Sequence, residues 1–181
     1  MSKCARFTVA ALVSVLLLAR GNTGFALPGD KDQPIHIESE EAIRDEKNGL
    51  THYQGKVRIR QGSMRISADL VTLYHLESPA DKIVAKGKPA RMQLQHEPDE
   101  EPIHAEGELI EYYKEQQRVH ISHRAKLEQG GSTVRSDSIE YFINQELVKA
   151  VADESVSGEA QGRVRVVIPP SRLEQDETGG D

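Results

Sequence analysis

Aromatic side chains are scarce in this chain of 181 residues, which has no tryptophan, three phenylalanines and five tyrosines. Walls rich in aromatic rings suit sugars or bases, so the composition argues against such ligands. An apolar interior built from this sequence has to be mostly aliphatic, with Met64 and Met92 among its pliable members. Such an interior suits acyl chains, or it simply fills a closed core.

The only cysteine, Cys4, lies in a segment that we expect to be removed. Two basic residues precede an uncharged, mostly apolar stretch at 7–19, and a motif of small residues ends at Ala26. This layout is typical of a secretory signal peptide at 1–26, cleaved after Ala26, and it is too short for a stable membrane span. The exported chain then has no cysteine, which excludes a disulfide and a cysteine-ligated metal.

Positive charge is in the minority, with 23 basic residues against 29 acidic ones and a net charge of −6. Removal of 1–26 takes away three basic residues and no acidic one, which leaves a net charge of −9. A chain of this charge is not expected to bind nucleic acid, and the charge keeps a sheet protein soluble. We expect one domain at 27–170 and a disordered acidic tail at 171–181.

Motifs that carry reaction chemistry are missing as well. The sequence has no glycine-rich phosphate loop, no nucleophile elbow and no HExxH motif. The close histidine pair, His120 and His123, lies in a predicted strand, where residues three apart point to opposite faces. We therefore predict no metal site, no cofactor and no enzymatic activity.

A short phrase recurs four times along the chain: an apolar residue, any residue, Ala or Ser, and then an acid. Recurrence at such a period is typical of stacked units that cannot bury their apolar faces alone. Asp69 and Asp137 fall at equivalent places in two copies, which favours a structural role for them. The copies are Ile37-Glu38-Ser39-Glu40, Ile66-Ser67-Ala68-Asp69, Ile103-His104-Ala105-Glu106 and Val134-Arg135-Ser136-Asp137, with starts separated by 29, 37 and 31 residues.

The segments between these phrases alternate apolar and charged residues, as at 55–60, 88–94, 118–127 and 162–168. A period of two predicts β-strands with one buried face. Short connections that contain glycine separate them, as hairpins require. The sequence therefore predicts an all-β protein in which each repeat is about two antiparallel, hairpin-linked strands.

A helical solenoid is the alternative, because 41–48 and 110–118 could each form a short helix. Neither segment has a sustained stripe at i, i+3, i+4 and i+7, so the pattern favours strands.

Alternation also predicts which side chains face inward. Ile35 shares a face with Ile37, Val57 with Ile59, and Met64 with Ile66. The neighbouring cations Lys56, Arg58, Arg60 and Arg65 could meet phosphates, but the alternation favours a solvated outer face for them.

Four segments of the chain are distinctive in combination, namely DQPIHIESE at 32–40, YQGKVRIRQGSMRISADLV at 53–71, GKPA at 87–90 and VVIPPSRL at 166–173. In these segments the chain resembles the LptA (OstA-like) family of periplasmic lipopolysaccharide transport proteins. It departs at His123, where the family often has glycine. The resemblance implies a slightly twisted, antiparallel β-jellyroll with an open V-shaped groove and free edge strands.

The same resemblance implies a function: the protein carries the acyl chains of lipid A in its groove from the inner to the outer membrane. Ligand contacts are then expected at Tyr53, Leu73, Met92 and Tyr112 in addition to the six inward residues above. Copies are expected to associate head to tail. The alternative is a structural periplasmic β-protein that polymerises through its edges around a closed core, without carrying lipid.

Edge strands are the expected partner sites, because an open sheet exposes unpaired backbone groups at both ends. Pro34 and the Pro169-Pro170 pair limit the two outer segments. By the resemblance, the edge facing an LptC-like inner-membrane protein comprises Ile35, His36, Ile37, Glu38 and Ser39. The edge facing an LptD-like outer-membrane protein comprises Val164, Arg165, Val166, Val167 and Ile168.

Overall fold

The computed structural model describes residues 33–75, 82–95, 100–152 and 163–170. The predicted signal peptide and the predicted acidic tail lie outside these described residues. Within them, no helix combines the length and the hydropathy needed to cross a membrane.

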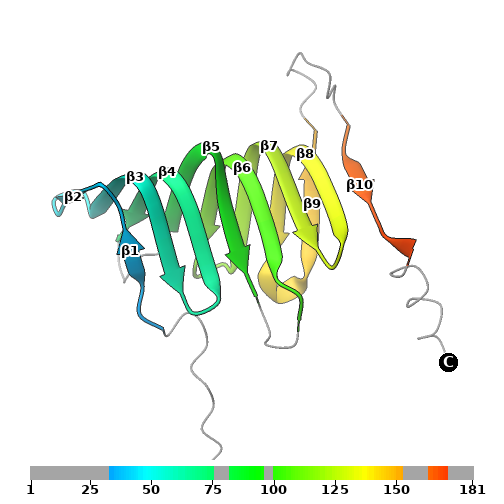
Figure 1. Cartoon of the computed structure of the whole chain (residues 1–181), viewed down its shortest axis with the longest axis horizontal. Helices are drawn as coiled ribbons and strands as arrows, with labels where there is room; N and C mark the ends of the chain where they lie inside the picture. The colour runs from blue at the N-terminus through cyan, green and yellow to red at the C-terminus, as the bar shows by residue number, and fades with distance from the viewer. Residues whose placement is uncertain (1–32, 76–81, 96–99, 153–162, 171–181) are drawn as a thin grey trace, which may run out of the picture.

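The described strands form one antiparallel sheet (Figure 1). Its order is β1-β3-β4-β5-β6-β7-β8-β10, with β2 also paired to β3 and β9 also paired to β8. The sheet stays open, so the predicted open, all-β antiparallel architecture is confirmed. The strands are β1 (His36–Glu38), β2 (Glu41–Asp45), β3 (Leu50–Gln61), β4 (Met64–Tyr74), β5 (Lys82–Leu94), β6 (Ile103–Tyr113), β7 (Arg118–Gln129), β8 (Ser132–Phe142), β9 (Leu147–Val151) and β10 (Arg165–Val167), and a 3-10 turn, η2 (Ile143–Gln145), precedes β9.

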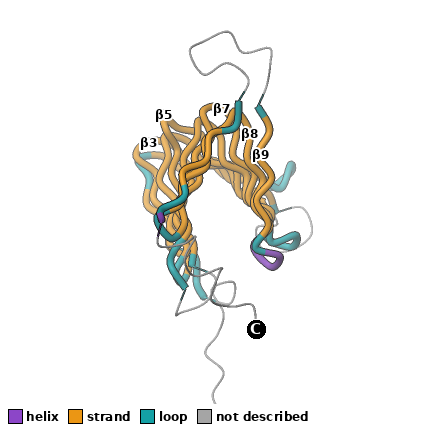
Figure 2. Tube along the Cα trace, turned by 90° about the vertical axis from the view of Figure 1, so that its right-hand side faces the viewer, coloured by secondary structure: helices purple, strands orange, loops and turns teal. Residues whose placement is uncertain are grey.

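A crease runs across the sheet and folds it into two leaves. The register shifts at the middle of each pairing from β3/β4 to β7/β8, and such bulges bend strands. The first leaf holds β1, β10 and one half of each long strand, and the second leaf holds β2, β9 and the other halves. Figure 2 shows the resulting arch. The shifts fall at Gln54/Val57, Ser67/Leu70, Lys86/Ala90, Glu106/Leu109 and Ser122/Ala125.

The recurring phrase of the sequence marks the places where the chain crosses this crease. Its first copy ends between β1 and β2, and its second and third copies end at the shifts in β4 and β6. The fourth copy ends at Asp137, between the halves of β8 that pair around Ser136 and Ser138. Each copy therefore lies where a strand passes from the first leaf to the second, which explains the repeat.

The strands that return to the first leaf cross the crease with other backbone conformations. In β3, Gly55 and Lys56 have φ angles of 82° and 45°. In β7, His123 and Arg124 have φ angles of 61° and 57°. This left-handed region is strained for side chains with a Cβ, and glycine is the residue that adopts it at least cost.

The segments that the helical alternative relied on are extended. Residues 41–45 form β2, and a turn at 46–49 connects it to β3. Asp45 accepts hydrogen bonds from the backbone and side-chain amides of Asn48 at 3.0 and 2.7 Å, which closes this turn. Residues 110–113 complete β6, and a second turn leads into β7.

The predicted hairpins are present. Gly130 and Gly131, with φ angles of 57° and 75°, form the two-residue connection between Gln129 and Ser132. Positive φ at both central residues is the twist that matches two adjacent antiparallel strands.

The crossing in β7 gives a test of the crease. His123→Gly should raise the free energy of unfolding by about 0.5–1 kcal/mol, because glycine removes the left-handed strain at an exposed position. Ser122→Gly, one residue earlier in regular strand conformation, should lower it by about 0.5–1 kcal/mol. Urea denaturation checks both variants, and equal destabilisation by the two would show that the left-handed conformation stores no strain.

Candidate functional site

An unbroken apolar row crosses the inner face of the first leaf from one edge of the sheet to the other. Adjacent members are direct partners across neighbouring strands, so their side chains touch along the row. Exposure rises from 1% at Ile59 to 4% at Leu127 within the row, and it reaches 54% at Val166 at the edge. The row is Ile37, Ile59, Ile66, Met92, Ala105, Leu127, Val134 and Val166.

The inner face of the second leaf carries two further rows. One joins Tyr53, Val71, Ala85, Ile110, Ile121, Ile139 and Ala150. The other joins Thr51, Leu73, Ile83, Tyr112, Val119, Tyr141 and Val148. The buried residues of both leaves belong to one hydrophobic cluster, so the crease brings the rows face to face.

The structure places all ten predicted ligand residues on these inner faces. Three of them, Ile35, Ile37 and Tyr53, are half-buried against the cluster near the N-terminal edge. The other seven are buried, namely Val57, Ile59, Met64, Ile66, Leu73, Met92 and Tyr112. These ten residues lie on both leaves and come from segments that are far apart in the sequence.

The sequence analysis missed the inner residues contributed by β7 and β8. Ile121, Ile139 and Tyr141 are at most 2% exposed and form the far half of the interior. The alternation that could have found them is present in the sequences RVHIS and SIEYF.

Each end of the sheet has two edge strands, one in each leaf. The predicted segments at 35–39 and 164–168 contain β1 and β10, which pair with β3 and β8 in the first leaf. The second leaf ends in β2 and β9, which the sequence analysis did not assign as edges. Their side chains include the exposed Ile43 and Val151.

The two ends differ in chemistry. At the C-terminal end, Val164, Val166, Val167 and Ile168 are all exposed around a short edge strand. At the N-terminal end, Glu38 of β1 contacts two arginines of β3 at 3.8 and 3.9 Å. Exposed apolar side chains on an unpaired edge favour addition of another strand, whereas charged edges resist it unless the partner is complementary.

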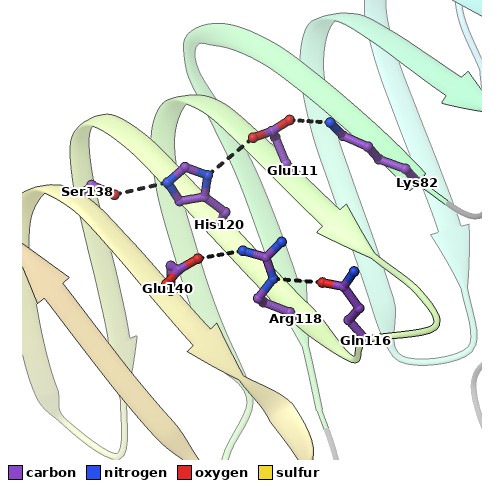
Figure 3. A network of polar contacts seen from close by, with 7 residues as sticks. All are labelled: Lys82, Glu111, Gln116, Arg118, His120, Ser138 and Glu140. Atoms are coloured by element: carbon purple, nitrogen blue, oxygen red, sulfur yellow. Dashed lines mark hydrogen bonds and ion pairs between the residues drawn. The ribbon is translucent and has the colours of Figure 1, made fainter.

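A polar network covers the outer face of the second leaf (Figure 3). Glu111 lies between Lys82, at 2.5 Å, and the Nδ1 atom of His120, at 3.2 Å. The Nε2 atom of His120 is 3.0 Å from the Ser138 hydroxyl. Arg118 donates a hydrogen bond to Glu140 at 2.5 Å, in a neighbouring part of the same network.

The network keeps its partly buried charges paired. Burial opposes ionisation of Glu111, but hydrogen bonds from Lys82 and His120 outweigh it and hold the pKa of this carboxyl below its ordinary value. Burial likewise disfavours the Lys82 ammonium, yet Glu111 and Tyr113 raise its pKa. The outer face of the second leaf is therefore a neutralised surface.

Ser138, His120 and Glu111 follow the order of a hydroxyl, an imidazole and a carboxylate found in hydrolase triads. Ser138 lies in the middle of β8, in register with Ser122 of β7 and Val151 of β9. The ladders on both sides occupy the backbone N–H groups that would have to stabilise an oxyanion. This arrangement fits a structural network. Among the described residues, no three histidine, cysteine or acidic side chains gather as a metal site.

An open antiparallel sheet, folded at a crease around an aliphatic interior, defines this chain as an all-β protein of the open jellyroll class. Residues 36–147 match the family described as LptA/(LptD N-terminal domain) LPS transport protein. The chain belongs to this family.

Individual relatives agree with this assignment. The lipopolysaccharide export system protein LptH of Pseudomonas aeruginosa is 32% identical over 167 residues, which cover 91% of this chain and 95% of LptH. LptA of Escherichia coli strain K12 is 31% identical over 166 residues, which cover 91% of this chain and 86% of LptA. The crystal structure of P. aeruginosa LptH superposes with a TM-score of 0.72 at 30% identity, covering 79% of this chain and 100% of the other.

The buried phenol of Tyr141 gives a test of the interior. Burial raises the pKa of the Tyr141 phenol to about 12, and the negative charges of Glu146 and Glu100 contribute to the rise to a smaller extent. The unfolded chain loses this proton near pH 10, so the stabilising contribution is complete below pH 10 and is lost as the pH rises toward 12. The free energy of unfolding should therefore fall by about 1.4 kcal/mol between pH 8 and pH 11.

Tyr141→Phe should remove this component of the pH dependence. Urea unfolding of both proteins at pH 8, 10 and 11 measures it. Parallel stability profiles for the two proteins would mean that the phenol reaches solvent in the folded state.

Proposed function

We propose that the protein is a periplasmic lipopolysaccharide-binding bridge protein, which carries the acyl chains of lipid A between its leaves from the inner toward the outer membrane. The observation that carries this function is the apolar row that runs from Ile37 at one edge to Val166 at the other. Membership in a lipopolysaccharide transport family supports the ligand class. The aliphatic lining suits acyl chains better than flat aromatic or sugar rings.

The continuity of the row explains how an apolar chain could pass between molecules. Because the row ends at half-buried Ile37 and exposed Val166, a partner that adds a strand at either edge extends the row without a polar break. An LptC-like inner-membrane protein uses the N-terminal edge and an LptD-like outer-membrane protein uses the C-terminal edge. Further copies of the chain associate head to tail through the same edges.

Transport of this kind needs no bond making, so we assign no catalytic residue and no cofactor. The leader ending at Ala26 is cleaved on export, and the mature protein works in the periplasm. Relatives named as export system proteins support this setting.

A second candidate function is a structural β-protein that polymerises through its edges without lipid. It is favoured by the closely packed interior, in which Ile110, Ile121 and Ile139 are at most 1% exposed. For lipid carriage, the leaves must therefore separate at the crease when an acyl chain enters. The two functions differ in whether an interior side chain ever contacts lipid.

Tyr112 and Tyr113 allow that contact to be tested with a matched pair. They are neighbours in β6 with opposite orientations, Tyr112 buried in the interior and Tyr113 stacked beneath Lys82 and Arg118 outside. Replacing Tyr112 with a photo-crosslinking phenylalanine should capture lipopolysaccharide in growing cells, whereas the same replacement at Tyr113 should not. Capture at both positions, or at neither, would refute carriage between the leaves.

Proline substitutions test the use of the edges. Adjacent strand residues direct their N–H groups to opposite sides, so one of Ile37→Pro and Glu38→Pro removes an outward donor of β1. That variant should lose the LptC-like partner in pull-down while it keeps the LptD-like partner and bound lipid. At β10, one of Val166→Pro and Val167→Pro removes an outward donor in the same way. That variant should lose the LptD-like partner while it keeps the LptC-like partner and bound lipid.

Circular dichroism provides the folding control for these four variants. If every folded variant retains both partners, strand addition at β1 and β10 is not how the protein assembles. Loss of both partners by a folded β1 variant would contradict the assignment of one partner to each end.

A further inference from the structure

The outer face of the first leaf concentrates positive charge in an otherwise acidic protein. One row, formed by direct partners on neighbouring strands, contains Arg58, Arg91, Lys126, Arg135 and Arg165, with Glu38 and Glu106 as its acids. The adjacent row adds Arg60 and Arg65. We call these seven cations the cationic face. It lies on the opposite side of the leaf from the apolar row of the interior.

Several of these cations face one another directly. Arg60 is the partner of Arg65 across β3 and β4, and Arg135 lies between Lys126 of β7 and Arg165 of β10. Like charges in directly opposed positions destabilise a sheet. An arrangement that works against the stability of the sheet is better explained by an anionic ligand than by folding.

Three carboxylates of these rows contact cations of the face. Glu38 is shared between Arg58 and Arg60 at 3.9 and 3.8 Å, which is long for an ion pair. Glu106 contacts Arg91 at 3.1 Å, and Glu128 contacts Lys126 at 2.7 Å. By register, the two rows therefore hold seven cations and three acids.

The cationic face is hollowed in two places. The first hollow, of about 440 Å³, is lined by Arg58, Arg60, Arg65 and Arg91 and by the residues between them on the same strands, which include Ile59 and Met92. The second, of about 410 Å³, is lined by Arg124, Lys126, Arg135, Arg163 and Arg165, with Asp137. Glu106 borders both hollows, so they are neighbours on one surface.

We propose that the cationic face binds a soluble polyanion through its phosphate groups. Planar guanidinium groups match phosphate oxygens with paired hydrogen bonds, and each hollow presents several of them. The hollows centre near β4/β5 and β7/β8, three strand spacings or about 14 Å apart, so each hollow can take a short polyphosphate of its own. The proposal uses the outer face alone and does not depend on lipid carriage between the leaves.

Inorganic tripolyphosphate is the probe for this site. We expect saturable binding by isothermal titration calorimetry at low salt and a rise in the thermal unfolding midpoint with ligand concentration. Arg65→Gln combined with Arg135→Gln changes one cation in each hollow and should weaken binding at least tenfold. Stability without ligand should not fall on the single change Arg65→Gln, because that change removes the charge opposite Arg60.

Arg44→Gln combined with Lys149→Gln is the matched control, since it removes two positive charges from β2 and β9 of the second leaf. This control should bind tripolyphosphate as tightly as the unchanged protein. Equal weakening in the control and the test variant would show nonspecific charge attraction and overturn the proposal. Binding of phosphatidylglycerol vesicles without binding of tripolyphosphate would also overturn it, in favour of a membrane surface.

Lipid capture separates this site from the proposed function. The variant with Arg65→Gln and Arg135→Gln should still capture lipopolysaccharide through a crosslinker at position 112. Loss of tripolyphosphate binding with retained capture supports two independent sites, and loss of both in a folded variant overturns the independence of the cationic face.

Discussion

The crease is the constraint on which the rest of the structure depends. Ladder pairing forces each long strand to follow its neighbours, so a bend in one strand has to occur at the same level in all of them. The register shifts from β3/β4 to β7/β8 provide this common bend. A flat sheet of the same residues would leave its apolar rows in water, whereas the folded sheet buries them against each other.

The same crease produces the edges. A barrel would remove unpaired strands by closure, but a sheet folded into two leaves ends twice at each side, in β1 and β2 and in β9 and β10. Natural sheets usually blunt such ends, and here the apolar side chains of β10 remain exposed. Open ends and a continuous interior are therefore one property of this architecture.

The outer faces of the leaves are chemically distinct although one chain builds both. On the second leaf, Glu111 and Glu140 each contact basic side chains and leave the surface neutral. On the first leaf, arginines such as Arg60 and Arg65 lie directly opposite each other. The long strands cross from one leaf to the other, so a single strand can contribute to both surfaces, as β7 does with the paired His120 on the second leaf and Lys126 on the first.

The sequence by itself determined the strands, the repeat, the hairpins and the inward alternation, because these depend on neighbours within a few residues. The pairs Ile35 and Ile37, Val57 and Ile59, and Met64 and Ile66 could each be assigned to a shared face from the period of two alone. The sequence did not determine that the repeated phrase lies at a crease, that β2 and β9 are edges, or that Ile121, Ile139 and Tyr141 complete the interior. Those features follow from register between strands that lie far apart in sequence, and only the tertiary structure decides which residues meet across the two leaves.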